Sequence, residues 1–130
     1  MPVADVTEIP IDGQVLVLTS AKASVSPNAL PDLLRRVQAD LGPRLDDYRR
    51  EFELVDEDDE RATFLVPSDH WERVGERLGF GRRETDAVER AHTEQLRRVA
   101  KNLDRRDEFE TALEIRSAVV VGIDRDADEE

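Results

Sequence analysis

The side chains best suited to chemistry are scarce in this chain of 130 residues. It has no cysteine and only two histidines, His70 and His92. These counts exclude a cysteine nucleophile, a disulfide framework and a thiolate zinc site. The sequence also lacks the signatures of zinc proteases (HExxH), serine hydrolases (GxSxG) and phosphate-binding loops (GxxxxGKS or GxxxxGKT). We therefore expect no catalytic residue, no metal ligand, no cofactor and no small-molecule substrate, which favours a non-enzymatic role.

Both histidines and the densest acidic run have structural interpretations. His92 falls among apolar residues. An imidazole titrates near about pH 6.5 and would make a proton switch, but we favour a hydrogen-bonded histidine at the core boundary. His70 opens a predicted helix, where Asp69 and Glu72 suit capping and the helix dipole better than metal binding. The run 56–60 lacks the spaced ligands and glycine of an EF-hand loop, so we interpret it as a solvated hairpin tip.

Residues 73–106 form a basic segment in an acidic chain. They carry ten basic and six acidic side chains, a local charge of +4, whereas the whole chain has a charge of −12. A basic segment in an acidic protein is a candidate nucleic-acid footprint. The candidate nucleic-acid-binding residues are Arg82, Arg83, Arg90, Arg97 and Lys101.

Within that segment, residues 74–85 resemble the helix-turn-helix of DNA-binding regulators. Gly75 stands where the first helix has a small residue, and Gly79 stands where the turn has a glycine. The second helix of such a motif enters the major groove with its N-terminal residues at the base edges. Thr85 departs from the pattern, because an apolar residue is expected near it, while Val88 fits the next apolar position. The resemblance implies a transcriptional regulator, which is the alternative functional hypothesis.

A plain helical hairpin explains the same segment without DNA. Two acids stand four residues before an arginine, the favourable order for pairing along a helix; the pairs are Asp86–Arg90 and Glu94–Arg98. Salt also opposes phosphate binding, because four phosphate contacts give a slope of about −3.6 in log affinity against log salt concentration. We favour the hairpin. Unpaired arginines on a protruding second helix would favour DNA instead; they are Arg82, Arg83 and Arg90.

The long helix predicted from Thr85 or Asp86 to about Asn102 supplies the leading functional hypothesis. Its apolar side chains share one stripe of the helical wheel. These candidate partner-binding residues are Val88, His92, Leu96, Val99 and Leu103. The stripe is long for one small core, and a polar residue within it suits a register-setting position between paired helices. We therefore expect a protein–protein interaction or assembly domain that forms a homodimer or binds another protein.

The periodicity predicts a helix-rich α+β fold, with a β-hairpin and a C-terminal strand packed against three to four helices. The predicted elements are a helix over 30–41, a hairpin over 51–66, helices over 69–79, 85–102 and from 104 onward, and a strand over 117–123. Residues 14–19 are compatible with a buried strand or a helix, because the run is β-branched but continues a helical spacing. We favour the strand.

Residues 11–123 are predicted to form a single compact domain. Residues 1–10 show no sustained periodicity, and the acidic tail 124–130 has no large apolar side chain, so both ends should be disordered. No apolar run approaches the ~18 residues of a membrane span. No signal peptide opens the chain, and we expect a cytoplasmic protein that does not bind membranes.

The choice of charged residues indicates the solvent. Of the 19 basic residues, 17 are Arg and two are Lys, and they face 31 acids. A charge of −12 loosens a small fold in dilute buffer through self-repulsion, but in molar salt the Debye length falls to ~3 Å. This acidic, lysine-poor, cysteine-free composition resembles that of small uncharacterised proteins from halophilic archaea. The resemblance implies a high-salt cytoplasm and no named functional family.

Overall fold

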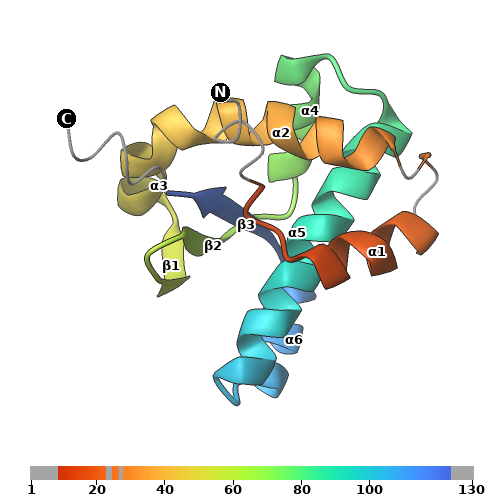
Figure 1. The fold of residues 1–130 in the computed structure, drawn as a ribbon. Coiled ribbons are helices and arrows are strands. Elements are labelled where there is room, and N and C mark those ends of the chain that lie inside the picture. Colours follow the sequence, from red (N-terminus) through yellow and green to blue (C-terminus); the bar gives the residue numbers. More distant parts are fainter. Residues whose placement is uncertain (1–8, 23–24, 27, 124–130) are drawn as a thin grey trace.

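The computed structural model describes residues 9–22, 25–26 and 28–123. The elements are α1 (Gly13–Lys22), α2 (Ala29–Leu41), the 3₁₀ turn η2 (Gly42–Arg44), α3 (Leu45–Glu51), β1 (Glu53–Glu57), β2 (Arg61–Pro67), α4 (His70–Leu78), α5 (Arg82–Asn102), α6 (Arg106–Leu113) and β3 (Arg116–Gly122) (Figure 1). The predicted helix-rich α+β class, with a hairpin and a C-terminal strand, is confirmed.

The three strands form one antiparallel sheet in the order β1-β2-β3. β2 lies in the middle, and a register shift between Leu54 and Asp56 bends the outer strand β1. At the hairpin tip, the Asp58 carboxylate accepts hydrogen bonds from the backbone N–H groups of Glu60 (2.7 Å) and Arg61 (2.9 Å). The acidic run is therefore a turn stabilised by its own aspartate, as the sequence predicts.

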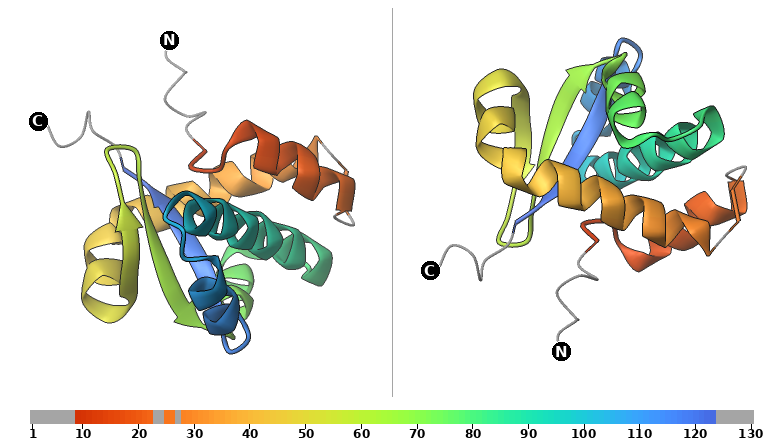
Figure 2. Two further views of the ribbon diagram at one scale, coloured as in Figure 1. Left: turned by 90° about the horizontal axis from the view of Figure 1, so that it is seen from below. Right: turned by 90° about the horizontal axis from the view of Figure 1, so that it is seen from above.

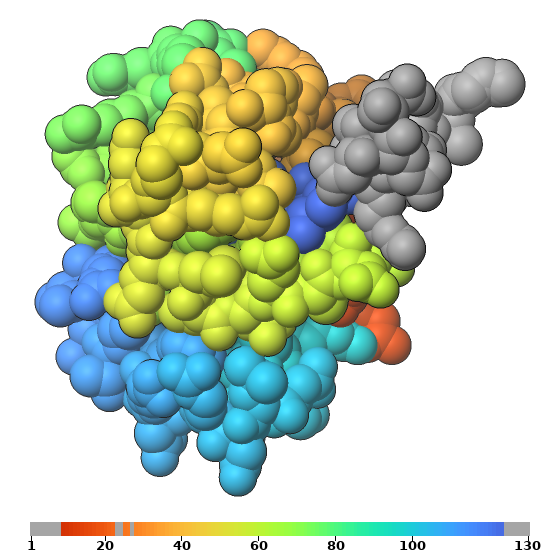
Figure 3. All heavy atoms as spheres, turned by 90° about the vertical axis from the view of Figure 1, so that its left-hand side faces the viewer, coloured from red at the N-terminus to blue at the C-terminus, as the bar shows by residue number. Residues whose placement is uncertain are grey.

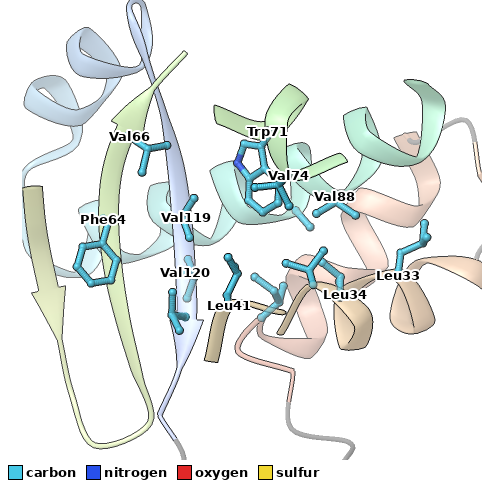
Figure 4. Close-up of a cluster of buried hydrophobic side chains, with 14 of the residues drawn as sticks. Leu33, Leu34, Leu41, Phe64, Val66, Trp71, Val74, Val88, Val119 and Val120 are labelled. Carbon is cyan, nitrogen blue, oxygen red and sulfur yellow. The ribbon is translucent and has the colours of Figure 1, made fainter. Parts of the chain in front are cut away.

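Side chains of β2 and β3 belong to two hydrophobic clusters. Phe64 and Val119 point into the larger cluster, which includes residues of α2 and α4 such as Leu34 and Trp71 (Figure 4). The opposite face packs against the second half of α5 and against α6, through residues that include Leu96. In the space-filling view, α3 and the hairpin cover one side of the molecule, with the end of α5 and α6 beneath them (Figure 3).

Side chains from three helices seal the outer edge of β3. Trp71 Nε1 of α4 donates to the Ala118 carbonyl (2.9 Å), and the Val120 N–H donates to His92 Nδ1 of α5 (2.9 Å). The side-chain amide of Gln38 on α2 accepts from the Gly122 N–H (2.9 Å) and donates to the Gly122 carbonyl (3.1 Å). With these backbone groups bonded to side chains, the edge is a poor template for another strand. The sheet therefore ends at β3.

The prediction of a strand over 14–19 is wrong, because these residues belong to α1. Val15 and Thr19, four residues apart, are the buried positions of this helix, and Ile11 precedes them in the core. With the β3 edge already occupied, the β-branched run packs as a helix beside α5, and this tertiary contact overrides the weak strand preference. The left-hand view of Figure 2 shows α1 alongside α5.

One predicted helix start and one predicted capping interaction also need correction. α5 begins at Arg82, three residues before Thr85, because the Glu84 carboxylate accepts a hydrogen bond from the Gly81 N–H (2.7 Å) and caps the helix there. Asp69 occupies the N-cap of α4 as predicted, but its side chain forms no capping hydrogen bond to the described residues. Its carboxylate pairs instead with Arg73 (3.1 Å).

The predicted disordered ends fall mostly outside the part of the chain that the structure describes, since residues 1–8 and 124–130 are not included. Where the two overlap, Ile9 packs against the larger cluster and Pro10 is buried. The core therefore begins two residues earlier than predicted.

Candidate nucleic-acid interface

The candidate interface is built on the junction of α4 and α5, which three residues connect, Gly79 to Gly81. Gly79 ends α4 in the left-handed region with a φ of 75°, a conformation that glycine adopts without strain. The Phe80 N–H then donates to the Gly75 carbonyl (2.8 Å), and the Gly79 N–H donates to the Glu76 carbonyl (3.2 Å). These two bonds form a Schellman motif, so Gly79 is the turn glycine that the sequence predicts.

Gly75 is needed because the start of α5 lies against it. A methyl group at Gly75 would overlap the Thr85 hydroxyl oxygen and lie 3.2 Å from Thr85 Cγ2. The Thr85 hydroxyl in turn donates to the Gly81 carbonyl (3.0 Å). Thr85 thus satisfies its hydroxyl locally at the place where an apolar residue was expected, and Val88 is fully buried as predicted. The two helices have the close approach that a helix-turn-helix requires.

Helix α2 holds this junction from behind. The Arg36 guanidinium donates to the Leu78 carbonyl (2.8 Å) at the end of α4, and it lies 4.7 Å from the centre of the Phe80 ring. The Arg77 side chain bonds the Asp40 carboxylate through its Nε (3.2 Å). α4, the turn and α5 are therefore fixed to the rest of the domain.

The first turns of α5 carry arginines that point into solvent. Arg82, Arg83 and Arg90 are exposed, and none forms an ion pair with any of the described residues. The predicted Asp86–Arg90 pair is thus not formed, although both side chains are exposed one helical turn apart. The start of α5 therefore presents three positive charges that the described fold does not neutralise.

A family model matches residues 9–123, which span the whole described fold. The chain belongs to this family, described as Domain of unknown function (DUF8048). No curated protein and no solved structure matches the chain. The functional site of this DUF8048 domain must therefore be inferred from its own geometry.

Further along α5, the candidate Arg97 is engaged inside the protein. Its guanidinium pairs with Glu94 (2.6 Å) and with Glu110 of α6 (2.8 Å). Arg98 pairs with Asp12 (2.8 Å), so the predicted Glu94–Arg98 pair is wrong. Lys101 is exposed and has no ion-pair partner within the described ranges. Of the five candidate residues, Arg97 is the one whose guanidinium is occupied by ion pairs within the described fold.

The stripe predicted to contact a partner is largely inside the domain. Val88, His92 and Leu96 are buried against the chain's own sheet and helices, and Val99 is half-buried. Leu103 alone of the five is exposed, at 40%. This corrects the interpretation of the stripe, because three of its five side chains cannot reach a partner while the domain is folded.

His92 is a structural residue, as favoured from the sequence. Its Nδ1 accepts the Val120 N–H, and its ring centre lies 4.6 Å from that of Trp71. Burial lowers the pKa of His92 to about 3. The imidazole is therefore neutral at physiological pH and is no proton switch there.

A second group of polar side chains, which the sequence did not single out, surrounds Tyr48. A surface hollow of about 170 Å³ lies beside Tyr48, Phe52 and His70. The Tyr48 hydroxyl lies 2.6 Å from His70 Nε2. Burial raises the pKa of Tyr48 to about 12 and lowers that of His70 to about 4, so a neutral phenol and a neutral imidazole share this hydrogen bond. The pair satisfies a buried tyrosine, and both neighbouring arginines, Arg44 and Arg77, are paired with Asp40.

Two other features are absent from the described residues. No group of three or more acidic, histidine or cysteine side chains is placed there to hold a metal ion. Within the same ranges, no helix combines the length and apolarity that a membrane crossing requires.

Proposed function

We propose that this protein binds double-stranded DNA through α4 and α5, with the start of α5 in the major groove. The observation that carries the proposal is the exposure of Arg82, Arg83 and Arg90 without ion-pair partners among the described residues, directly after a glycine turn. Further along the same helix, Arg97 and Arg98 are paired with acids. The guanidinium groups of Arg82, Arg83 and Arg90, which have no ion-pair partner among the described residues, are therefore available to an external acceptor.

The chemistry of these side chains suits the edges of G·C base pairs. An arginine can donate two hydrogen bonds to O6 and N7 of a guanine, and an aspartate can accept one from N4 of a cytosine. Asp86 is exposed between Arg82 and Arg90 on the same helix, so the surface offers both kinds of group. We expect a G·C-containing site, with each good contact worth about 1–3 kcal/mol against a wrong base.

The charge of the whole chain favours base recognition over simple phosphate binding. A net charge of −12 repels nucleic acid in dilute buffer. We place the protein in the high-salt cytoplasm of a halophilic archaeon, as its composition suggests. On a slope of about −3.6, a 20-fold rise in salt removes roughly 10⁴–10⁵ of phosphate-based affinity. Contacts to the bases must then supply most of the binding.

The test is a selection of duplexes from a random pool in molar KCl, with the full chain as bait. We expect a short enriched motif, and a pool without any motif would contradict the proposal. Binding of the enriched duplex is then measured by fluorescence anisotropy for the double variant Arg82→Ala/Arg83→Ala. Losing two bidentate contacts should weaken binding by roughly 30-fold or more.

A matched control removes the same charge elsewhere. Arg49 and Arg50 are also adjacent and exposed, but they lie on α3 and pair with Asp46 and Asp47. The double variant Arg49→Ala/Arg50→Ala should leave the affinity for the enriched duplex within about threefold, since exposed charges away from the interface act weakly at high salt. Equal losses in both double variants would contradict a specific role for α5.

A protein–protein assembly role is the second candidate, and one observation favours it. The side chains of Val17 and Leu18 on α1 are 71% and 56% exposed, which is unusual for large apolar residues side by side. The predicted assembly face on α5 is buried, so any assembly would use a different surface.

A further inference from the structure

Helix α1 differs from every other helix of this protein in the charge of its surface. Its ten residues include no aspartate or glutamate, and Lys22 at its end is the only charged side chain. The chain as a whole is 38% charged. The exposed residues of α1 are Gly13, Gln14, Val17, Leu18, Ala21 and Lys22. The uncharged stretch of this surface from Gln14 through Val17 and Leu18 to Ala21 is here called the α1 face, and Lys22 borders it at the end of the helix.

The inner side of α1 is firmly held, so exposure of the outer side does not reflect a loose helix. Val15 and Thr19 are buried at 4% and 1% exposure. Just before the helix, the Asp12 carboxylate pairs with Arg61 (3.1 Å) and Arg98 (2.8 Å), and the Asp12 N–H donates to the Gln95 side chain (2.8 Å). The α1 face is therefore a rigid apolar surface.

We propose that the α1 face pairs with the α1 face of a second copy of this chain across a two-fold axis. Residues 14, 17, 18 and 21 follow the spacing of an apolar seam between two helices. Two chains of charge −12 repel each other over most of their surface, and the α1 face is a place where they can meet without bringing acids together. A basic partner would instead find its complement on the acidic surface elsewhere.

Other exposed apolar side chains do not form such a face. Ile115, at 73% exposure, stands between Glu114 and Arg116. Leu54, at 44%, lies on β1 with Glu53 before it and Asp56 two residues after it. Single apolar residues among charges are ordinary on protein surfaces. The α1 face is distinguished because its apolar residues are contiguous and uncharged.

This pairing would also suit the proposed DNA-binding role, and that part of the argument rests on that role. α1 packs beside α5 (Figure 2), and packed helices lie about 8–10 Å apart. Two-fold pairing through α1 gives the order α5, α1, α1, α5, which places the two α5 helices roughly 24–30 Å apart. Adjacent half-sites on one side of DNA are about 34–36 Å apart. This span is shorter than one helical turn of DNA, so the two-fold predicts a palindromic motif but does not set the distance between its half-sites.

The test is the molar mass in molar KCl, measured by light scattering after gel filtration up to about 100 µM, where a small interface should be populated. The wild-type mass should be about twice the 14.8 kDa of one chain. Val17→Glu should halve it, because pairing would bury a carboxylate. Ile115→Glu is the matched control, with nearly the same exposure (73% against 71%), and should remain a dimer. Circular dichroism checks that both variants keep their helices.

A wild-type monomer at the highest concentration would overturn the pairing, and so would a dimer that survives Val17→Glu. These outcomes are separate from those of the DNA selection. A dimer without an enriched motif contradicts DNA binding alone, whereas a monomer that selects a single half-site contradicts the pairing alone.

Discussion

The contact between Gly75 and Thr85 permits the sharpest test of the α4–α5 junction. In Gly75→Ala, the added methyl group would overlap the Thr85 hydroxyl oxygen. Forcing an extra methyl group into a packed contact costs about 1–3 kcal/mol. If Thr85 turns away, it also loses its bond to the Gly81 carbonyl (3.0 Å), which is worth about 1 kcal/mol. The higher helix propensity of alanine stabilises the folded state by about 1 kcal/mol and offsets part of this loss. We expect a net loss of about 1–3 kcal/mol in the free energy of unfolding.

The assay is urea unfolding in molar KCl, with a double-mutant cycle to isolate the contact. In a Thr85→Ala background the overlapping atoms are gone, so Gly75→Ala should become neutral or stabilising there. Gly13→Ala is the control, because a methyl group at Gly13 meets no described atom within 4 Å. Additive effects of the two substitutions, or a Gly75→Ala variant as stable as wild type, would refute the close packing of α4 on α5.

Two further predictions concern pH and salt. The pKa of His92 is lowered to about 3 by burial, while the unfolded imidazole titrates near about 6.5. Only the unfolded chain binds this proton between those values, so stability falls as the pH drops below about 6.5, by up to about 1.4 kcal/mol per pH unit from this residue. His92→Gln, which keeps an acceptor for the Val120 N–H, should show a shallower slope in urea unfolding between about pH 7 and pH 5; parallel slopes would contradict a buried neutral imidazole. The thermal midpoint should rise from dilute buffer to molar KCl, because screening reduces the self-repulsion of a −12 chain; a flat melting series would show that this charge does not limit stability.

Local sequence patterns were sufficient to predict those elements whose structure follows from their own residues. Helix α2 followed from apolar side chains at helical spacing, and the buried residues of that helix are Leu30, Leu33, Leu34, Val37 and Leu41. The hairpin followed from the two apolar runs around an acidic turn. Gly75 and Gly79 could be placed because each has a local geometric requirement, a close approach and a positive φ.

The errors came from contacts between residues distant in the sequence. The run 14–19 suits a strand or a helix, and the choice depends on a β3 edge that α2, α4 and α5 have already sealed. The helical wheel of α5 correctly identified the apolar stripe. A helical period in the sequence, however, does not indicate whether the stripe is covered by a sheet of the same chain or by a partner. The ion pairs show the same limit, because Arg98 pairs with Asp12, 86 positions before it, rather than with the nearby Glu94.

The candidate interface was only partly visible in the sequence for the same reason. The basic segment and its glycines located the α4–α5 junction, but acids at helical spacing predicted that Arg90 and Arg98 would be paired with Asp86 and Glu94. The fold brings Glu110 of α6 to Arg97 and leaves Arg82, Arg83 and Arg90 without a partner among the described residues. Tyr48 gave no signal at all, because its hydrogen-bond partner His70 lies 22 residues away.

The most direct test of DNA binding through α5 is nuclear magnetic resonance of the arginine side-chain Nε–H groups, during titration of the selected duplex in molar KCl. We predict that the resonances of Arg82, Arg83 and Arg90 shift on binding, while those of Arg49 and Arg50 on α3 stay in place. Saturable shifts confined to other arginines, or none at any duplex concentration, would contradict the proposed role of α5.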